Sequence, residues 1–133
     1  MKATRACLSA ALSALLLVAC DATPQGPEVD GAALYADNCL VCHQVDGGGV
    51  PFMQPPLDGS AVALDDPEVF ADFVLRGTID REDWASDYQN RMPGFAHLGD
   101  ADLAAILSYV RKSFGNDAGP VSADEVAAAR AGN

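Results

Sequence analysis

Basic residues are scarce in this chain of 133 residues, which has 8 Lys and Arg against 19 Asp and Glu and a formal net charge of −11. Because contacts with nucleic-acid phosphates need clustered Lys and Arg, this balance argues against a nucleic-acid-binding protein. The shortage is also local, since no Lys or Arg stands between Cys20 and Leu75, where ten Asp and Glu occur. We therefore expect partners with a basic or neutral docking face. The alternative is that the acidic residues only keep the protein soluble.

Cysteines, strand patterns and long apolar runs are scarce as well. Four Cys in this length are too few to indicate a disulfide scaffold by number alone. No segment alternates apolar and polar residues as a half-buried strand does, and no internal repeat occurs. The apolar run over residues 10–19 is shorter than the roughly 20 residues that span a bilayer. The length predicts a single domain.

The first 19 residues are organised like a secretory signal peptide, with Lys2 and Arg5 before a short apolar run. The following Leu17-Val18-Ala19-Cys20 resembles the lipobox of bacterial lipoproteins. That resemblance implies a lipid anchor at Cys20 on the periplasmic side of the inner membrane. The alternative is a plain signal peptide and a soluble periplasmic protein. Residues 20–29 contain two Pro and one Gly, which is typical of a flexible tether.

The rest of the chain predicts an all-α fold with three to five helices. Capping residues predict helices after Asp30 over residues 31–38, after Asp66 over 67–76 and after Asp100 over 101–114. A capping-box pattern predicts a short helix in the tail 116–133. The expected inward-facing residues are Ala33, Leu34, Tyr35, Val69, Phe70, Phe73, Val74, Leu103, Ile106, Leu107, Val110 and Phe114. The loops over 46–60 and 78–99 are long for so small a domain, so we expect something other than protein at its centre.

Cys39-Leu40-Val41-Cys42-His43 is a CxxCH sequence, which in an exported bacterial protein is the attachment signature of a c-type haem. Two thiols three residues apart can form thioethers to the two vinyl groups of one haem, while the adjacent His reaches the iron. A zinc site would need further ligands, of which the chain offers His97, Cys7 and Cys20. A thioredoxin-like site would need a βαβ setting, and a simple disulfide would need only an oxidising compartment. The motif therefore predicts one covalent haem c.

The sixth iron ligand separates an electron carrier from a gas-binding or peroxidatic haem. Met53, Met92 and His97 are the candidates. Met53 follows His43 by ten residues, whereas Met92 lies on the loop before the last core helix, with enough chain to reach the opposite haem face. Met92 is the expected ligand, although packing in the core is the alternative for any Met.

Residues 30–115 resemble a class I, monohaem cytochrome c. Gly31 and Tyr35 precede Cys39 as in that family's N-terminal helix. Ile106 and Tyr109 match its C-terminal helix, which crosses the first helix at the Gly. The resemblance implies a cytochrome c fold with long loops wrapped around one covalent haem.

The resemblance also implies roles for two prolyl segments. The carbonyl of Pro55 would accept the Nδ1 proton of His43, which leaves Nε2 for the iron. Met92-Pro93 would supply the axial Met. The candidate partners of the haem propionates are Arg76, Trp84, Tyr88 and Arg91. The alternative is that the two Arg are solvated surface charges and that Trp84 and Tyr88 pack within a loop.

These observations predict a membrane-tethered monohaem protein that transfers single electrons to and from redox proteins of the periplasm or inner membrane. It is expected to have no catalytic residues of its own. The first alternative is a fixed cytochrome subunit of a dehydrogenase or oxidase complex. The second is a five-coordinate haem that serves as a sensor or peroxidase.

Overall fold

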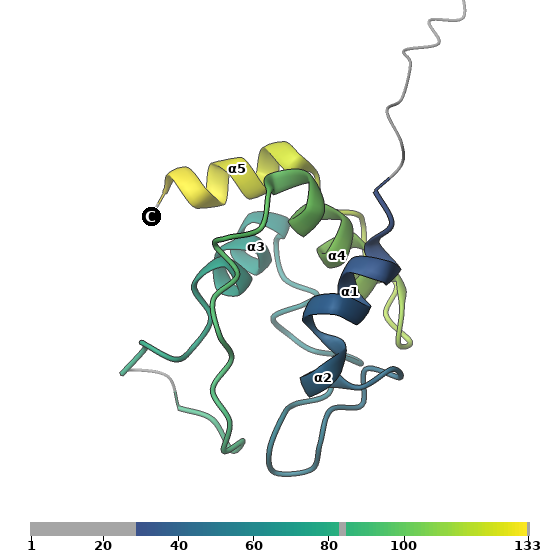
Figure 1. The fold of residues 1–133 in the computed structure, drawn as a ribbon, viewed down its shortest axis with the longest axis vertical. Helices are drawn as coiled ribbons and strands as arrows, with labels where there is room; N and C mark the ends of the chain where they lie inside the picture. The colour runs from purple at the N-terminus through teal and green to yellow at the C-terminus, as the bar shows by residue number, and fades with distance from the viewer. Residues whose placement is uncertain (1–28, 83–84, 133) are drawn as a thin grey trace, which may run out of the picture.

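The structure is a computed structural model that describes residues 29–82 and 85–132. These residues form five helices and no strand: α1 (Gly31–Asn38), α2 (Leu40–His43), α3 (Pro67–Arg76), α4 (Asp100–Lys112) and α5 (Ala123–Ala131) (Figure 1). The predicted all-α class is confirmed. None of the described helices is long and apolar enough to cross a membrane. The predicted signal peptide, Cys20, most of the tether and Trp84 lie outside the described residues.

Helices α1 and α4 cross in close contact at Gly31 (Figure 1). A Cβ atom added to Gly31 would lie 2.2 Å from the carbonyl oxygen of Ala105, so a larger residue would push the helices apart. One turn later, the buried ring of Tyr35 packs on Tyr109 with 5.4 Å between ring centroids. Because Gly31 and Tyr35 share the face that meets α4, the expectation that Ala33 faces inward is wrong, and Ala33 is exposed.

Helix α3 begins and ends where the sequence predicts. The carboxylate of Asp66 accepts a hydrogen bond from the Glu68 N–H at 3.0 Å, Pro67 is the first helical residue, and Gly77 follows the last. The buried face consists of Phe70, Ala71, Val74 and Leu75. Val69 is half exposed, so its predicted inward orientation is wrong.

Helix α4 carries the predicted apolar stripe of Leu103, Ile106, Leu107 and Val110, all of which are buried. Gly99 is its N-cap and Asp100 its first residue, which corrects the expectation that Asp100 caps it. The helix also ends at Lys112. Phe114 lies beyond it with a φ of 60° and turns back onto Tyr35, with 5.3 Å between ring centroids.

Helix α5 begins with the predicted capping box of Ser122 and Glu125. It packs against α3 and α4 (Figure 1), and Val126 is completely buried there. The buried guanidinium of Arg111 on α4 donates to the Gly119 carbonyl at 2.6 Å and to the Ala63 carbonyl at 2.9 Å. The described part of the tail therefore belongs to the same core as the rest of the fold.

Candidate functional site

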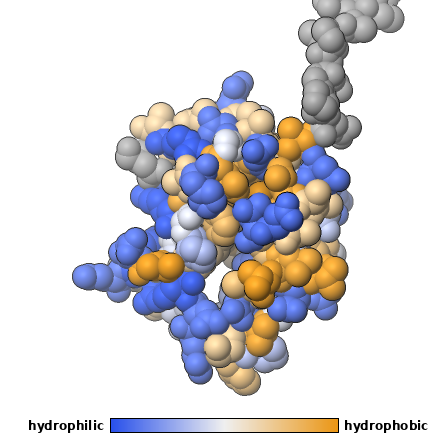
Figure 2. Space-filling model, in the orientation of Figure 1, coloured by the Kyte–Doolittle hydropathy of each residue, from blue (hydrophilic) through white to orange (hydrophobic). Residues whose placement is uncertain are grey.

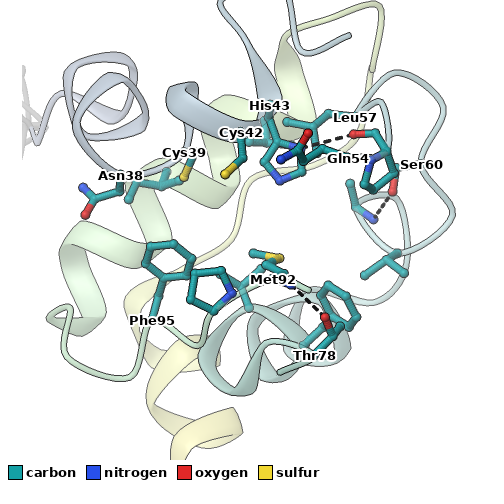
Figure 3. Close-up of a pocket in the computed structure, with 18 of the residues that line it drawn as sticks. Asn38, Cys39, Cys42, His43, Gln54, Leu57, Ser60, Thr78, Met92 and Phe95 are labelled. Carbon is teal, nitrogen blue, oxygen red and sulfur yellow. Dashed lines mark hydrogen bonds between the residues drawn. The ribbon is translucent and has the colours of Figure 1, made fainter. Parts of the chain in front are cut away.

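A cavity of about 350 Å³ lies between α2, α3, α4 and the two long loops. Figure 2 shows the molecule hollowed between these parts, and Figure 3 shows side chains that line the hollow. The lining is mainly apolar and includes Leu57, Phe70, Phe73, Val74, Ile106 and Leu107. The predicted long loops thus help to enclose an apolar space between themselves and the helices.

Both cysteines of the CxxCH sequence border this cavity as free thiols (Figure 3). Cys39 is the C-cap of α1 and Cys42 lies in the short helix α2, so one helical turn presents both. Burial, with a smaller contribution from the neighbouring Cys42, raises the pKa of the Cys39 thiol to about 11. Because reactive cysteines depend on a lowered pKa, this environment is unlike that of a redox-active thiolate.

The ring of His43 also borders the cavity, and its Nδ1 atom lies 3.2 Å from the carbonyl oxygen of Pro55. A carbonyl oxygen can only accept, so this contact requires the proton on Nδ1 and leaves the Nε2 lone pair free. Burial lowers the pKa of His43, which the hydrogen bond to Pro55 partly opposes. The structure therefore favours a neutral imidazole, the form that ligates metals.

The side chain of Met92 enters the cavity from the side opposite His43, and the two point towards one another (Figure 3). Two hydrogen bonds to the buried residue Thr78 hold its backbone. The Thr78 N–H donates to the Met92 carbonyl at 2.8 Å, and the Met92 N–H donates to Thr78 Oγ1 at 2.8 Å. Met92 is thereby fixed to the C-terminal end of α3.

Two glycines allow the Met92 segment to lie flat against α3. Gly77 has a φ of 65°, and a Cβ atom there would lie 2.5 Å from the Met92 carbonyl oxygen. A Cβ atom on Gly94 would lie 2.7 Å from the Leu75 carbonyl oxygen. The Phe95 N–H then donates to the Val74 carbonyl at 3.1 Å. The position of Met92 thus depends on close backbone packing as well as on hydrogen bonds.

The remaining candidate ligands are placed differently. Neither Met53 nor His97 is among the described residues that line the cavity. His97 packs beside Phe95 instead, with 5.8 Å between ring centroids. Within residues 29–82 and 85–132, no three His, Cys, Asp or Glu side chains gather as a metal site would require. Cys7 and Cys20, which the sequence also offers as zinc ligands, lie outside the described residues.

Some of the candidate propionate partners line the cavity and others do not. Tyr88 and Arg91 line the cavity, and Arg91 donates to the carbonyls of Thr78 and Arg81 at 3.4 and 3.3 Å. Arg76 pairs with Asp72 on the surface of α3 and is not among the described lining residues.

Thr78 is the site residue that the sequence did not reveal. It follows the Gly that ends α3, and nothing local distinguishes it from a surface loop residue. Its role depends on pairing with Met92, which is fourteen residues away. Two thiols, one neutral imidazole and one thioether thus border a single apolar cavity, and this set of donors fits a covalently attached haem.

Comparisons with known proteins agree with this chemistry. The sequence model of the cytochrome c family matches residues 28–114. The cytochrome c subunit of the quinone alcohol dehydrogenase of Gluconobacter oxydans (strain 621H) is 41% identical over 99 residues, which are 72% of this chain and 21% of that protein. The fructose dehydrogenase cytochrome subunit of Gluconobacter japonicus is 38% identical over 112 residues, 77% of this chain and 22% of that protein.

A smaller relative is matched over most of its own length. Cytochrome c-552 of Thermus thermophilus is 31% identical over 96 residues, which are 67% of this chain and 71% of that protein. By contrast, the chain spans about a fifth of the length of the dehydrogenase subunits.

Proposed function

This chain belongs to the cytochrome c family, and we propose that it is a periplasmic carrier of single electrons in which His43 and Met92 ligate the iron. Haem c is attached covalently through Cys39 and Cys42. When bound, the haem supplies an iron that gains and loses one electron. The protein is thus an electron carrier.

The observation that carries the proposed ligation is that His43 and Met92 point towards one another from opposite sides of one apolar cavity (Figure 3). If His43 and Met92 both held the iron, the protein itself would supply both ligands and would leave no position for a gas or a peroxide. This favours electron transfer over a sensor or peroxidase function.

The surrounding residues have supporting roles in this proposal. Pro55 holds the proton of His43 on Nδ1, so that Nε2 faces the cavity. Thr78 holds the backbone of Met92 on the other side. The apolar lining disfavours the more highly charged oxidised state and therefore raises the reduction potential.

The test of the ligation is the absorption spectrum of the oxidised holoprotein. We expect a far-red sulfur-to-iron charge-transfer band that disappears in Met92→Ala and persists in Met53→Ala. Met53 is a matched control because it is not among the described residues lining the cavity. A high-spin spectrum of the wild type, or a band that survives Met92→Ala, would contradict the proposal.

A second candidate is a fixed cytochrome subunit of a dehydrogenase complex. It is favoured by the relatives, several of which are cytochrome subunits of alcohol, fructose and gluconate dehydrogenases. The two candidates differ in how the protein migrates after mild detergent solubilisation of the membranes. A free carrier should elute as a small species, and a fixed subunit should elute together with a large dehydrogenase.

We also propose a docking face formed by Val41, Val45 and Phe52, which are 79%, 76% and 75% exposed. Val41 borders the cavity, and in Figure 2 hydrophobic surface gathers over α2 and the loop after it. No Lys or Arg occurs from residue 29 to residue 75. Such a face suits a partner whose surface is apolar with basic or neutral surroundings.

Electron exchange with small ions tests this face without a natural partner. Added salt should slow the reaction with a cobalt tris-phenanthroline cation and speed the reaction with ferricyanide, an anion. Val45→Lys should slow the reaction with the cobalt cation and speed the reaction with ferricyanide. Both changes should be larger than in Ala127→Lys, which adds the same charge at an exposed position of α5. Equal effects of the two variants would contradict this location.

Membrane attachment through a lipidated Cys20 completes the proposal. Replacing Cys20 with Ser should move the protein from the membrane fraction to the soluble periplasmic fraction. It should also abolish the incorporation of labelled fatty acid. A wild-type protein that already fractionates as soluble would instead support a plain signal peptide.

A further inference from the structure

The side chain of Arg130 on α5 reaches the segment that joins the Met92 loop to α4. Its Nη1 donates to the Ala96 carbonyl at 2.7 Å and its Nη2 to the Leu98 carbonyl at 2.8 Å. Its Nε donates to Asp100 Oδ1 at 2.9 Å. One guanidinium therefore holds three points of residues 96–100, and it does so from a helix beyond the family match.

The segment is held at its other end by α3. There, Met92 is bonded to Thr78 through both its N–H and its carbonyl, and the Phe95 N–H donates to the Val74 carbonyl. Residues 92–95 are thus fixed by α3 and by Thr78 just beyond its end, and residues 96–100 are fixed by α5. A shift of the second part would pull directly on the first, because the two are continuous.

Helix α5 is itself held in place by packing in the core and by hydrogen bonds that join the segment before it to α4. Val126 is completely buried and Ala129 is 8% exposed, so the residue next to Arg130 is packed in the core. Ahead of the helix, the Val121 N–H donates to Ser108 Oγ at 2.9 Å, and Ser108 Oγ donates to the Val121 carbonyl at 3.0 Å. The helix is therefore joined to α4 before Arg130 is reached.

The two carbonyl contacts matter more than the ion pair. The side chains of Arg130 and Asp100 are 35% and 37% exposed, and ion pairs in such positions contribute little. The carbonyls of Ala96 and Leu98 precede α4 and lie outside its own hydrogen-bond ladder. A planar guanidinium can reach both at once, which an ammonium group cannot do with the same geometry.

We propose that Arg130 is a positioning residue for Met92, and that α5 thereby controls how readily the Met92 thioether leaves the iron. This inference rests on the proposed ligation by Met92. It assigns a role in the redox site to a helix that the matched family region does not include.

Competition by imidazole tests the proposal in the oxidised holoprotein. Imidazole binds iron only when Met92 is displaced, so its apparent affinity reports how often the loop opens. We expect Arg130→Ala to bind imidazole about tenfold more tightly than the wild type, and Arg130→Lys to lie in between. Lys112→Ala, which removes the exposed Lys112–Asp117 pair elsewhere on α4, should match the wild type.

Amide hydrogen exchange gives a second measurement, which does not require imidazole to bind the iron. In Arg130→Ala, the Phe95 amide should exchange about tenfold faster, while amides in the middle of α4 should keep their rates. Imidazole affinity and Phe95 exchange that both stay within about twofold of the wild type would overturn the proposal. If the wild type shows no sulfur-to-iron band, the ligation by Met92 fails instead, and the exchange result alone decides whether Arg130 holds the loop.

Discussion

Replacing Gly31 with Ala should destabilise the protein by about 2 kcal/mol. The new Cβ would lie 2.2 Å from the Ala105 carbonyl oxygen, whereas ordinary contacts begin near 3.4 Å, so α1 and α4 must separate by about 1 Å. Overpacking costs about 1–3 kcal/mol, and the upper end applies because a helix backbone cannot turn away. The better helix propensity of Ala returns at most about 1 kcal/mol.

Urea unfolding of the holoprotein measures this difference, with Gly119→Ala as the matched control. No atom lies within 4 Å of the position that a Cβ would take on Gly119, so the same added methyl should leave stability unchanged or raise it by up to about 1 kcal/mol. Near-ultraviolet circular dichroism should also change in Gly31→Ala, because Tyr35 moves with α1. Equal unfolding free energies for the two variants would refute the argument that Gly31 sets the helix crossing.

Three further predictions concern single side chains. Thr78→Val should lower the unfolding free energy by about 1–2 kcal/mol, because the Met92 N–H loses its acceptor; an unchanged urea midpoint would contradict this. Arg111→Met should cost about 1–3 kcal/mol, because it leaves the buried Ala63 carbonyl and the partly buried carbonyls of Asp65 and Gly119 without this donor; a loss below about 1 kcal/mol would contradict this. Two hydrogen bonds lower the pKa of Glu125 below its ordinary value of 4.5. The larger effect comes from the Ser122 backbone N–H and the smaller from the Ser122 hydroxyl. The stability that Glu125 adds is therefore present above that value and lost as pH falls through the lowered pKa, so Glu125→Gln should differ from the wild type at neutral pH and converge with it in acid.

The attachment motif could be predicted from the sequence because its chemistry is local. Cys39, Cys42 and His43 lie within one turn of chain, and any fold that forms that turn presents them together. The helix boundaries near Asp66 and Ser122 were predictable for the same reason, since a cap and the amides it accepts from are neighbours. Such features need no knowledge of the rest of the molecule.

The wrong predictions concern features that are set by residues far apart in the sequence. Ala33 and Val69 belong to apolar clusters, and periodicity alone could not tell which members face inward, because contacts such as Gly31 with Ala105 set the rotation of a helix. Asp100 was expected to cap α4, but its carboxylate lies against Arg130, thirty residues away. For Ala33 and Asp100, local propensity was overridden by a contact that only the folded chain makes.

Helix α5 was predicted as a helix but not as part of the core, because Val126 is its one large apolar residue and no apolar stripe is visible. A chain shortened at residue 114, where the family match ends, would uncover the surfaces of α3 and α4 on which Val126 and Ala129 pack. Uncovered apolar surface of this kind promotes self-association. For this chain, the segment that the family model matches is therefore smaller than the unit that should be expressed, crystallised or fused to another protein, and that unit extends at least to Arg130.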